Sequence, residues 1–365
     1  MTAKSILEHQ KHILESYPST VSRDYYLAPL SIRVQSNSEA LIERLDDYFK
    51  FFIGSEENFN DAKLIEIHAL QSPMDPLDID YKDWPRDPGK IGRKDSFYDF
   101  ENGRACRKVK TGMQYLISDK ARIIFGDCLS NDNQVINYIN AQQIRELLLD
   151  GAVLCHAAGI YNQNGGLGIS ARSGGGKSTL ALHMIRQGFG FVSNDRLLVK
   201  SEAGRLSMAG VAKQPRVNPG TLLNNPDLIE ILEEKKRKRL LTLPKSELWE
   251  LEDKYDVDVG DIYGADRVAL NTSLNLYAVL DWAYDDTNET KAEQISPENF
   301  AYIHSRIAKS PGVFYMDEEQ KGLVPPIATP VEHYLPVFKN LPIYRFSGKV
   351  DFDFAARFLS EKLGS

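Results

Sequence analysis

The chain has 365 residues, of which 42% are hydrophobic and 10% aromatic, which is enough for two or three domains with sizeable cores. Its net charge of −7 argues against binding of nucleic acid through the whole surface. The sequence has no run of about 18 apolar residues and therefore predicts no membrane span. Widely spaced cysteines without a Cys-x-x-Cys pair predict reduced thiols in a cytoplasmic protein and no zinc site: Cys106, Cys128 and Cys155.

Residues 1–130 predict a small N-terminal α/β domain of unknown role. The expected elements are a helix over 4–16, a strand over 25–34, a helix over 38–51, a strand over 63–70, a long surface loop over 72–95 and two or three strands within 97–127. This domain carries no motif that indicates a chemistry. One basic cluster in it either touches substrate or, as we favour, forms a solvated strand face: Arg104, Arg107, Lys108 and Lys110.

A β-hairpin is predicted after a helix over 131–150, because strand patterns flank the turn sequence Asn162-Gln-Asn-Gly-Gly. If the centre of the turn lies near 163–164, His156 lies across from about Ala171. A histidine within a strand is usually structural. Here its expected place, at the mouth of the loop that follows the hairpin, makes His156 a candidate active-site residue.

The hairpin leads into a phosphate-binding loop of the Walker A kind, Ser173-Gly-Gly-Gly-Lys-Ser-Thr, and a helix pattern over 177–187 follows. Glycines let backbone N–H groups converge on phosphate oxygens, Lys177 reaches the β- and γ-phosphates, and the Ser178 hydroxyl ligates Mg²⁺. The alternative is a flexible turn before an ordinary helix. The usual pattern begins with Gly, where this chain has Ala171. We expect ATP and Mg²⁺ here, with the nucleotide held by Ser173, Gly174, Gly175, Gly176, Lys177, Ser178 and Thr179.

A short strand over 189–193 ends in a polar cluster that contains Asp195. Strands of such sheets deliver acidic residues beside the phosphate loop, so Asp195 is a candidate for holding Mg²⁺ or for accepting a proton from a substrate hydroxyl. The alternative is an aspartate that begins a turn. Asp281, which also follows an apolar run, is a weaker rival for the metal.

The rest of the chain offers fewer signals. Arg216, in a rigid loop with two prolines, either clamps phosphate or forms a structural salt bridge. The basic run 235–239 predicts a helix with a charged face rather than a contact to polyanions, and the polar segment 240–268 predicts a lid or substrate arm. A strand over 341–346 and a helix over 353–363 are expected at the end.

From His156 to Asp195 the chain resembles bacterial HPr kinase/phosphorylase and, more closely, HPr-kinase-related proteins. The shared features are His156 before the loop, the loop Ser173-Gly-Gly-Gly-Lys-Ser, and the pair Asn194-Asp195 after it, although the family has an acid where this chain has Asn194. The resemblance implies an HPr kinase/phosphoenolpyruvate carboxykinase type of P-loop kinase domain, over 131–365. It also implies ATP- and Mg²⁺-dependent phosphoryl transfer to a hydroxyl, with His156, Lys177 and Asp195 as catalytic residues and Ser178 and Asp195 at the metal.

The function we expect is therefore that of an ATP-dependent kinase. The acceptor stays open, since a protein serine, an amino acid and a polyol all fit, and the oligomeric state is open too, a homo-oligomer included. One alternative is a nucleotide-dependent ATPase or switch that acts on a partner. Another is a degenerate nucleotide-binding scaffold, against which the intact Lys177-Ser178 pair argues.

Overall fold

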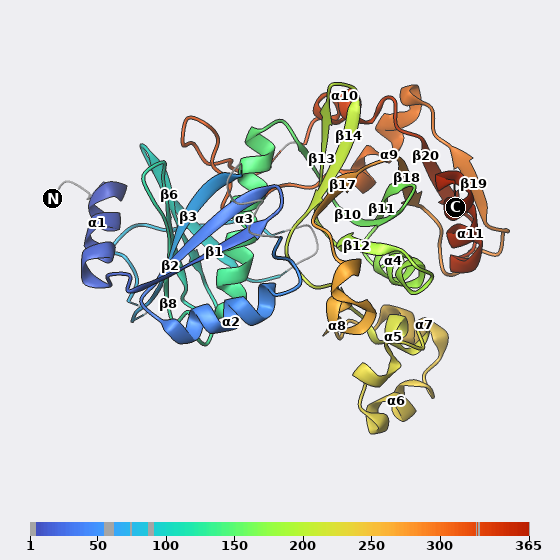
Figure 1. The fold of residues 1–365 in the computed structure, drawn as a ribbon, viewed down its shortest axis with the longest axis horizontal. Helices are drawn as coiled ribbons and strands as arrows, with labels where there is room; N and C mark the ends of the chain where they lie inside the picture. The colour runs from blue at the N-terminus through green and yellow to red at the C-terminus, as the bar shows by residue number, and fades with distance from the viewer. Residues whose placement is uncertain are drawn as a thin grey trace. The chain divides into compact units, whose positions relative to one another are not determined.

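A computed structural model describes residues 5–54, 62–73, 75–86, 91–325, 327 and 329–364 (Figure 1). The fold is mixed α/β, as predicted, and the chain divides into two compact units. Unit 1 comprises Met1–Asp150 with Ser310–Ala328, and unit 2 comprises Gly151–Lys309 with Thr329–Ser365. In the described part of the chain, no helix has both the length and the apolar character needed to cross a membrane.

Unit 1 is built on one eight-stranded sheet in the order β1-β2-β3-β8-β7-β6-β5-β4. β2 pairs parallel with β3 and β3 with β8, and the other pairs are antiparallel. The strands are β1 (Val21–Leu27), β2 (Leu30–Ser36), β3 (Lys63–Gln71), β4 (Lys82–Asp83), β5 (Asp95–Phe100), β6 (Gly103–Lys108), β7 (Gln114–Ile117) and β8 (Arg122–Gly126). The predicted strand over 25–34 is therefore a hairpin, which Leu27 and Leu30 close.

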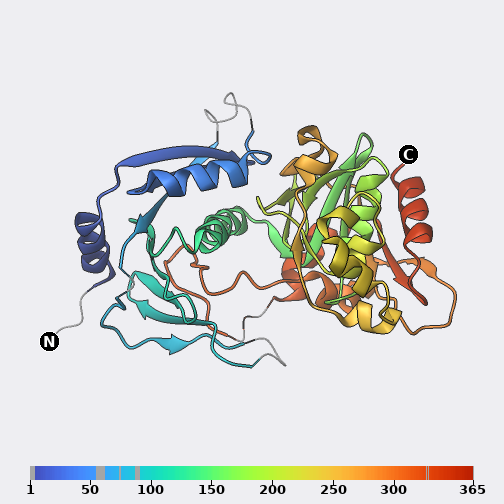
Figure 2. The ribbon, with the colours of Figure 1, turned by 90° about the horizontal axis from the view of Figure 1, so that it is seen from below.

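In the part of unit 1 that the structure describes, three helices cover this sheet: α1 (Ile6–Ser16), α2 (Glu39–Phe49) and α3 (Asp132–Leu149). Successive side chains of a strand point to opposite faces. Leu116 of β7 accordingly belongs to the core cluster under α1, whereas the ring of Tyr115 packs 5.1 Å from that of Tyr138 on α3. α2 lies along β1 and β2 on the α3 face (blue in Figure 2).

The two compact units divide at Asp150, and the sequence predicts a domain boundary near residue 130. α3 belongs to unit 1, because its Glu146 receives hydrogen bonds from Lys63 and Arg122 of the sheet at 2.6 and 2.8 Å. The segment after Ser310 also belongs to unit 1. No local sequence pattern predicts this return of the chain. Arg145 of α3 helps to hold it by donating to the Met316 carbonyl at 2.7 Å.

Arg104 corrects the expectation of a solvated basic strand face. Its side chain is 0% exposed and binds the Asp99 carboxylate through two nitrogens, at 2.6 and 3.1 Å. The guanidinium also donates to the carbonyls of Val313 and Leu323, both at 3.0 Å, and lies over the Phe97 ring. Arg104 therefore ties the returning segment to the sheet of unit 1.

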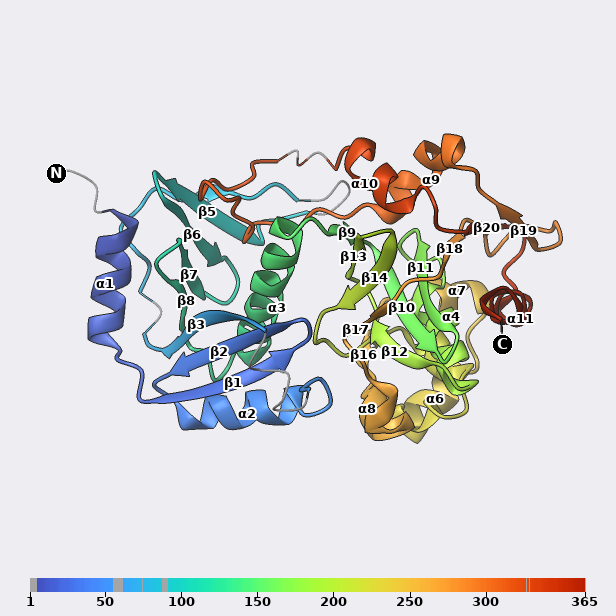
Figure 3. The same ribbon diagram turned by 45° about the horizontal axis from the view of Figure 1, so that its top comes forward.

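Unit 2 holds a six-stranded sheet, β12-β10-β11-β18-β20-β19, a four-stranded sheet, β17-β14-β13-β9, and the pair β15-β16 (Figure 3). The strands are β9 (Val153–Cys155), β10 (Ala157–Asn162), β11 (Gly165–Ala171), β12 (Gly190–Ser193), β13 (Leu197–Glu202), β14 (Arg205–Gly210), β15 (Arg216–Val217), β16 (Tyr255–Asp256), β17 (Asn271–Ser273), β18 (Leu276–Leu280), β19 (Lys291–Gln294) and β20 (Ile343–Ser347).

Helices pack on both faces of the six-stranded sheet. α4 and α11 contact each other on one face, and α9 and α10 contact each other on the other. Figure 1 shows α5 to α8 grouped at one end of the unit. The helices are α4 (Lys177–Arg186), α5 (Pro219–Leu223), α6 (Glu234–Leu240), α7 (Lys245–Glu250), α8 (Val259–Tyr263), α9 (Phe300–Ile307), α10 (Val331–Phe338) and α11 (Phe352–Leu363).

The strand directions decide where the site can form. β11 runs parallel to β18, and β18 runs parallel to β20. β12 is antiparallel to β10, which is itself antiparallel to β11, so β12 has the same direction as β11. The carboxyl ends of these four strands therefore share one edge of the sheet, which is where open α/β sheets bind ligands.

Candidate functional site

The hairpin β10–β11 has the predicted register. Asn162 pairs with Gly165 across a two-residue turn, and Ala157 pairs with Ser170. One step further along this register, His156 lies beside Ala171, where the phosphate loop begins. The backbone N–H of His156 donates to the Ile307 carbonyl at 2.7 Å, which fixes the residue against the end of α9.

The glycine-rich loop has the backbone that its sequence predicts. Gly174 and Gly176 adopt φ values of +78° and +86°, which favour glycine, and Gly176 caps the amino end of α4. The indole N–H of Trp282 donates to the Gly175 carbonyl at 2.9 Å. A Cβ atom at Gly176 would lie 2.8 Å from the Phe352 ring, so Trp282 and Phe352 shape the loop from outside its sequence.

Three nitrogen-bearing side chains converge on the Asp195 carboxylate, which remains 50% exposed. His156 Nε2 lies 3.0 Å from Asp195 Oδ1, and Lys177 Nζ lies 3.7 Å from the same oxygen. Lys309 Nζ lies 2.6 Å from Asp195 Oδ2. Lys177 also donates to the Asn194 carbonyl at 2.6 Å, so the lysine of the loop and the polar end of β12 are in direct contact.

This crowding sets the ionisation of the site. Burial alone would raise the pKa of Asp195, but the hydrogen bond from His156 and the charges of Lys309 and Lys177 outweigh it and hold that pKa well below its usual range. Burial lowers the pKa of Lys177 to about 8, although Asp195 opposes the change. Asp195 is thus a firmly ionised carboxylate, and Lys177 is a cation close to losing its proton.

Lys309 was absent from the sequence-based site, since it follows no motif and lies far along the chain. The structure places it through backbone contacts. Its N–H donates to the Leu154 carbonyl at 3.1 Å, and Ala308 forms a β-bridge with Cys155. Lys309, two residues after the end of α9, is therefore fixed beside β9, and its side chain reaches Asp195.

Asp281 is a poor rival for the metal. It follows β18 at the same edge of the sheet, but its side chain is only 10% exposed and both carboxylate oxygens are bound. Arg306 donates to Oδ1 at 3.2 Å and Arg345 to Oδ2 at 2.9 Å. Arg172, at 3.9 Å from Oδ1, adds a third positive charge. Asp281 therefore has the contacts of a structural ion-pair centre.

The segment between β14 and β17 contains Arg216 and the basic run 235–239, for which the sequence gave predictions. Arg216 pairs with Asp256 at 3.1 Å across β15 and β16, which is the structural salt bridge that the sequence left open. The basic run lies in helix α6, as predicted. Thr179 shares a hydrogen bond of 2.7 Å with Thr221 of α5, so the loop helix contacts this segment directly.

The residues present suit Mg²⁺ and a nucleotide. Ser178 and Asp195 offer oxygen ligands, which Mg²⁺ prefers. Gly174 and Gly176 leave the backbone of the loop without side chains, and Ser173 and Gly174 are exposed. These are the features that phosphate binding at a helix amino end requires.

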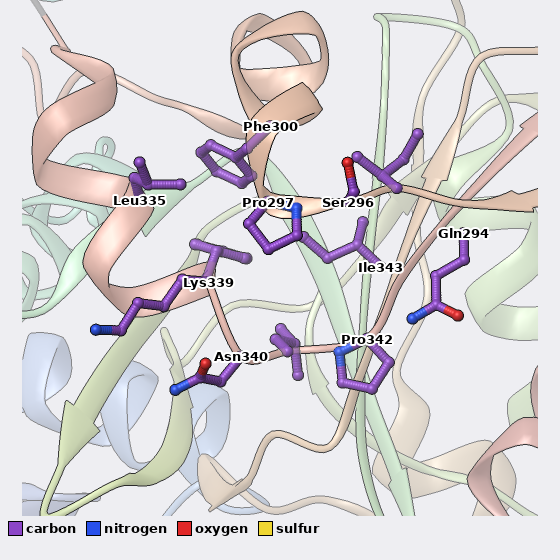
Figure 4. A pocket seen from close by; sticks show the side chains of 12 residues that line it. Gln294, Ser296, Pro297, Phe300, Leu335, Lys339, Asn340, Pro342 and Ile343 are labelled. Carbon is purple, nitrogen blue, oxygen red and sulfur yellow. The ribbon is translucent and has the colours of Figure 1, made fainter.

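A surface depression of about 390 Å³ lies elsewhere on unit 2 (Figure 4). Its lining includes Ser296 after β19, Phe300 and Leu335 on the helices, and Ile343 at the start of β20. The start of β20 is the amino edge of the parallel strands, whereas the phosphate loop lies at the carboxyl edge. The charged groups that converge on Asp195 lie at the carboxyl edge, away from this depression.

Comparison with known proteins finds a likeness among solved structures. No protein-family model matches the chain, and no curated protein matches it. Among solved structures, the chain is similar to the HPr(Ser) kinase/phosphatase from Coxiella burnetii, with 13% sequence identity and a TM-score of 0.28. The match covers 57% of this chain and 87% of the other.

Proposed function

We propose that this chain is an ATP-dependent phosphotransferase that moves the γ-phosphoryl group to a hydroxyl of an acceptor, with Mg²⁺ as cofactor. The observation that carries the proposal is the convergence of His156, Lys177 and Lys309 on Asp195 beside the phosphate loop. A loop that binds only phosphate needs no such assembly. Phosphoryl transfer needs it, because its catalysis consists mainly of positioning and electrostatic stabilisation.

Each residue has a role that its position supports. The backbone of 174–178 and Lys177 hold the phosphates of ATP, while Ser178 and Asp195 hold Mg²⁺, which would neutralise charge on the phosphates. The acceptor oxygen attacks the γ-phosphorus, the bond to the bridging oxygen breaks, and ADP leaves with the electron pair. Lys177 and Lys309 stabilise the negative charge that spreads over the transferring group.

The strongly lowered pKa of Asp195 favours the metal and positioning roles over that of a general base. An efficient base has a pKa near the working pH, and Asp195 is far below it. His156 fixes the Asp195 carboxylate through Nε2 at 3.0 Å. The hydroxyl proton can leave late in a loose transition state, to an oxygen of the transferred phosphoryl group or to water, so transfer does not require a strong base at this position.

The second candidate is an ATPase or switch that acts on a partner. It requires a residue that positions a water molecule and an arginine that reaches the transferring phosphate. The exposed Arg172, which follows β11 and is held only loosely at 3.9 Å from Asp281, is the observation in favour of this candidate. In both candidates the nucleotide binds at Lys177, so they differ in the fate of the phosphoryl group.

The experiment follows the label from γ-³²P-ATP in a cell extract, with the purified protein present or absent. A labelled acceptor that depends on the wild-type protein and is lost with Lys177→Met and with Asp195→Asn supports the kinase. Lys235→Met, in the exposed face of α6, is the matched control and should label normally. Release of free phosphate alone, from every extract fraction, would establish the ATPase instead.

A further inference from the structure

Two aromatic side chains contact each other at the surface of unit 2: Trp249 of α7 and Tyr284, which follows β18. Their ring centroids lie 5.2 Å apart, and the ring planes are inclined by 31°. Tyr284 is 41% exposed, and Trp249 is partly buried. Each residue of α7, all of which the structure describes, is at least partly exposed, so the Trp249 ring does not belong to a buried core. The pair therefore offers aromatic surface to a ligand.

The chain after β18 ties Tyr284 to the phosphate loop. Trp282, two residues before Tyr284, donates its indole N–H to the Gly175 carbonyl at 2.9 Å. Between them, the N–H of Ala283 donates to the Gly348 carbonyl at 3.1 Å, which fixes the backbone. Successive Cα atoms are about 3.8 Å apart, so the Tyr284 backbone starts within about 8 Å of that of Trp282.

A second route of direct contacts ties Trp249 to the helix that follows the loop. The hydroxyls of Thr179 on α4 and Thr221 on α5 share a hydrogen bond of 2.7 Å. A Cβ atom at Gly220, the residue before Thr221, would lie 3.6 Å from the side chain of Leu248, the neighbour of Trp249 on α7. Figures 1 and 3 both show α7 close to α4.

Gly175 and Thr179 lie on either side of Lys177 in the chain, so the two routes reach the pair from both ends of the phosphate-binding stretch. Backbone N–H groups of such a loop hold the α- and β-phosphates, and the lysine reaches the β- and γ-phosphates. The nucleoside is attached to the α-phosphate and extends away from the γ-phosphate. We therefore expect it to pass the first turn of α4, where Thr179 contacts α5, and to end near α7.

We propose that the base of the bound nucleoside triphosphate stacks on the pair Trp249–Tyr284. The proposal deepens the proposed function and rests on it, because the nucleotide concerned is the phosphoryl donor. A base is flat and uncharged, and it stacks on aromatic rings whatever its hydrogen-bonding pattern. The segment that the sequence predicts to be a lid or substrate arm thereby acquires a role toward the donor. The charged groups around Asp195 remain for the phosphates and the acceptor.

The test compares two ligands by calorimetry in the presence of Mg²⁺: a non-hydrolysable ATP analogue and inorganic tripolyphosphate, which has three linked phosphates and no nucleoside. Trp249→Ala should weaken binding of the analogue by about tenfold, because stacking on one aromatic side chain contributes about that much. It should change the Kd of tripolyphosphate by less than about twofold, since the loop stays intact. Tyr284→Ala should act in the same direction, and Trp249→Phe, which keeps an aromatic face, should bind the analogue nearly as the wild type does.

Control variants separate a stacking site from a structural role. Leu241→Ala truncates a side chain that is 63% exposed in the same segment, after α6, and should bind both ligands as the wild type does. Lys177→Met should weaken both ligands, because both occupy the loop. An unchanged Kd of the analogue in Trp249→Ala, or an equal loss of affinity for both ligands, would overturn the proposal.

Failure of the proposed function is a separate outcome. If the analogue binds through Trp249 but γ-³²P-ATP labels no acceptor, the kinase is wrong and the stacking site holds. If a labelled acceptor forms while Trp249→Ala binds the analogue as the wild type does, the stacking site is wrong and the kinase holds. If the analogue does not bind to the wild-type protein, both proposals fail.

Discussion

Lys309 lies with its Nζ 2.6 Å from Oδ2 of Asp195, although 114 residues separate the two along the chain. His156 and Lys177 occupy the other carboxylate oxygen. The side chain that follows β12 is thus fixed from both sides, by the loop and hairpin that precede it and by the end of α9. Lys309 is therefore a site residue in its own right.

Lys309→Met should lower kcat by about tenfold or more, because a partner that orients a functional group typically contributes that much. Loss of this cation should also raise the pKa of Asp195 toward its ordinary range. As the pH falls, the variant should therefore lose activity at a higher pH than the wild type does. The pH profile of phosphoryl transfer measures both effects. Lys309→Arg keeps the charge, so its activity at acidic pH should match that of the wild type. If the acidic side of the pH profile is unchanged in Lys309→Met, Lys309 does not set the ionisation of Asp195.

Nucleotide affinity should depend on pH through Lys177. Its pKa of about 8 in the free protein lies below its ordinary 10.5, so the charge that binds phosphate is complete below about pH 8 and is lost above it. The Kd for Mg-ATP should therefore rise by up to about tenfold per pH unit above that point. Calorimetric measurement of this Kd between about pH 7 and pH 9.5 tests the dependence. Lys177→Arg stays charged and should flatten the curve; a slope that persists in that variant would assign the effect elsewhere.

The lowered pKa of Lys177 has the opposite effect on the stability of the nucleotide-free protein, which should increase with pH. Between about pH 8 and 10.5 the unfolded chain binds more protons at Lys177 than the folded protein, so this group alone makes the free energy of unfolding increase with pH. Burial of the ammonium group is the main cause. Chemical denaturation of wild type and Lys177→Met across this range should show the increase only in the wild type.

Gly176 and Gly174 should differ in their tolerance of alanine. Both have positive φ, so alanine strains the backbone at either position. At Gly176 the added Cβ also meets the Phe352 ring at 2.8 Å, whereas at Gly174 no atom of the described chain lies within 4 Å. Gly176→Ala should therefore lose more Mg-ATP affinity than Gly174→Ala. Phe352→Ala combined with Gly176→Ala should restore part of the loss; if it restores none, the contact with Phe352 is not the cause.

Arg104→Met should destabilise unit 1 by about 2–4 kcal/mol. It removes the partner of Asp99 and leaves the carbonyls of Val313 and Leu323 without their donor. Denaturant unfolding measures the free energy of unfolding, and limited proteolysis should cut the segment after Ser310 sooner. Lys110→Met, at an exposed site, is the control and should cost less than about 0.5 kcal/mol. An equal effect of both variants would contradict the role given to Arg104.

Local sequence patterns predict a large part of the architecture. The turn at 163–164 set the register of the hairpin and so the place of His156 opposite Ala171. The glycine run predicted the positive φ values and the start of α4 at Lys177. These features depend on residues close together in the chain, whose backbone preferences and hydrogen bonds act locally.

The patterns failed where distant segments meet. The basic cluster at Arg104 looks solvated in the sequence, because nothing near it shows that the segment after Ser310 returns to cover it. The assignment of α3 to unit 1 likewise depends on contacts between distant segments, since Lys63 of the sheet donates to Glu146 of α3.

By itself, the sequence determined the mixed α/β fold, the backbone of the phosphate loop and the pairing that places His156 beside it. Only the tertiary structure decided that Lys309 lies against Asp195 and that Asp281 is held by Arg306 and Arg345. The physical reason is that charge interactions depend on distance in space, which chain folding sets, and single charged residues leave no periodic pattern in a sequence.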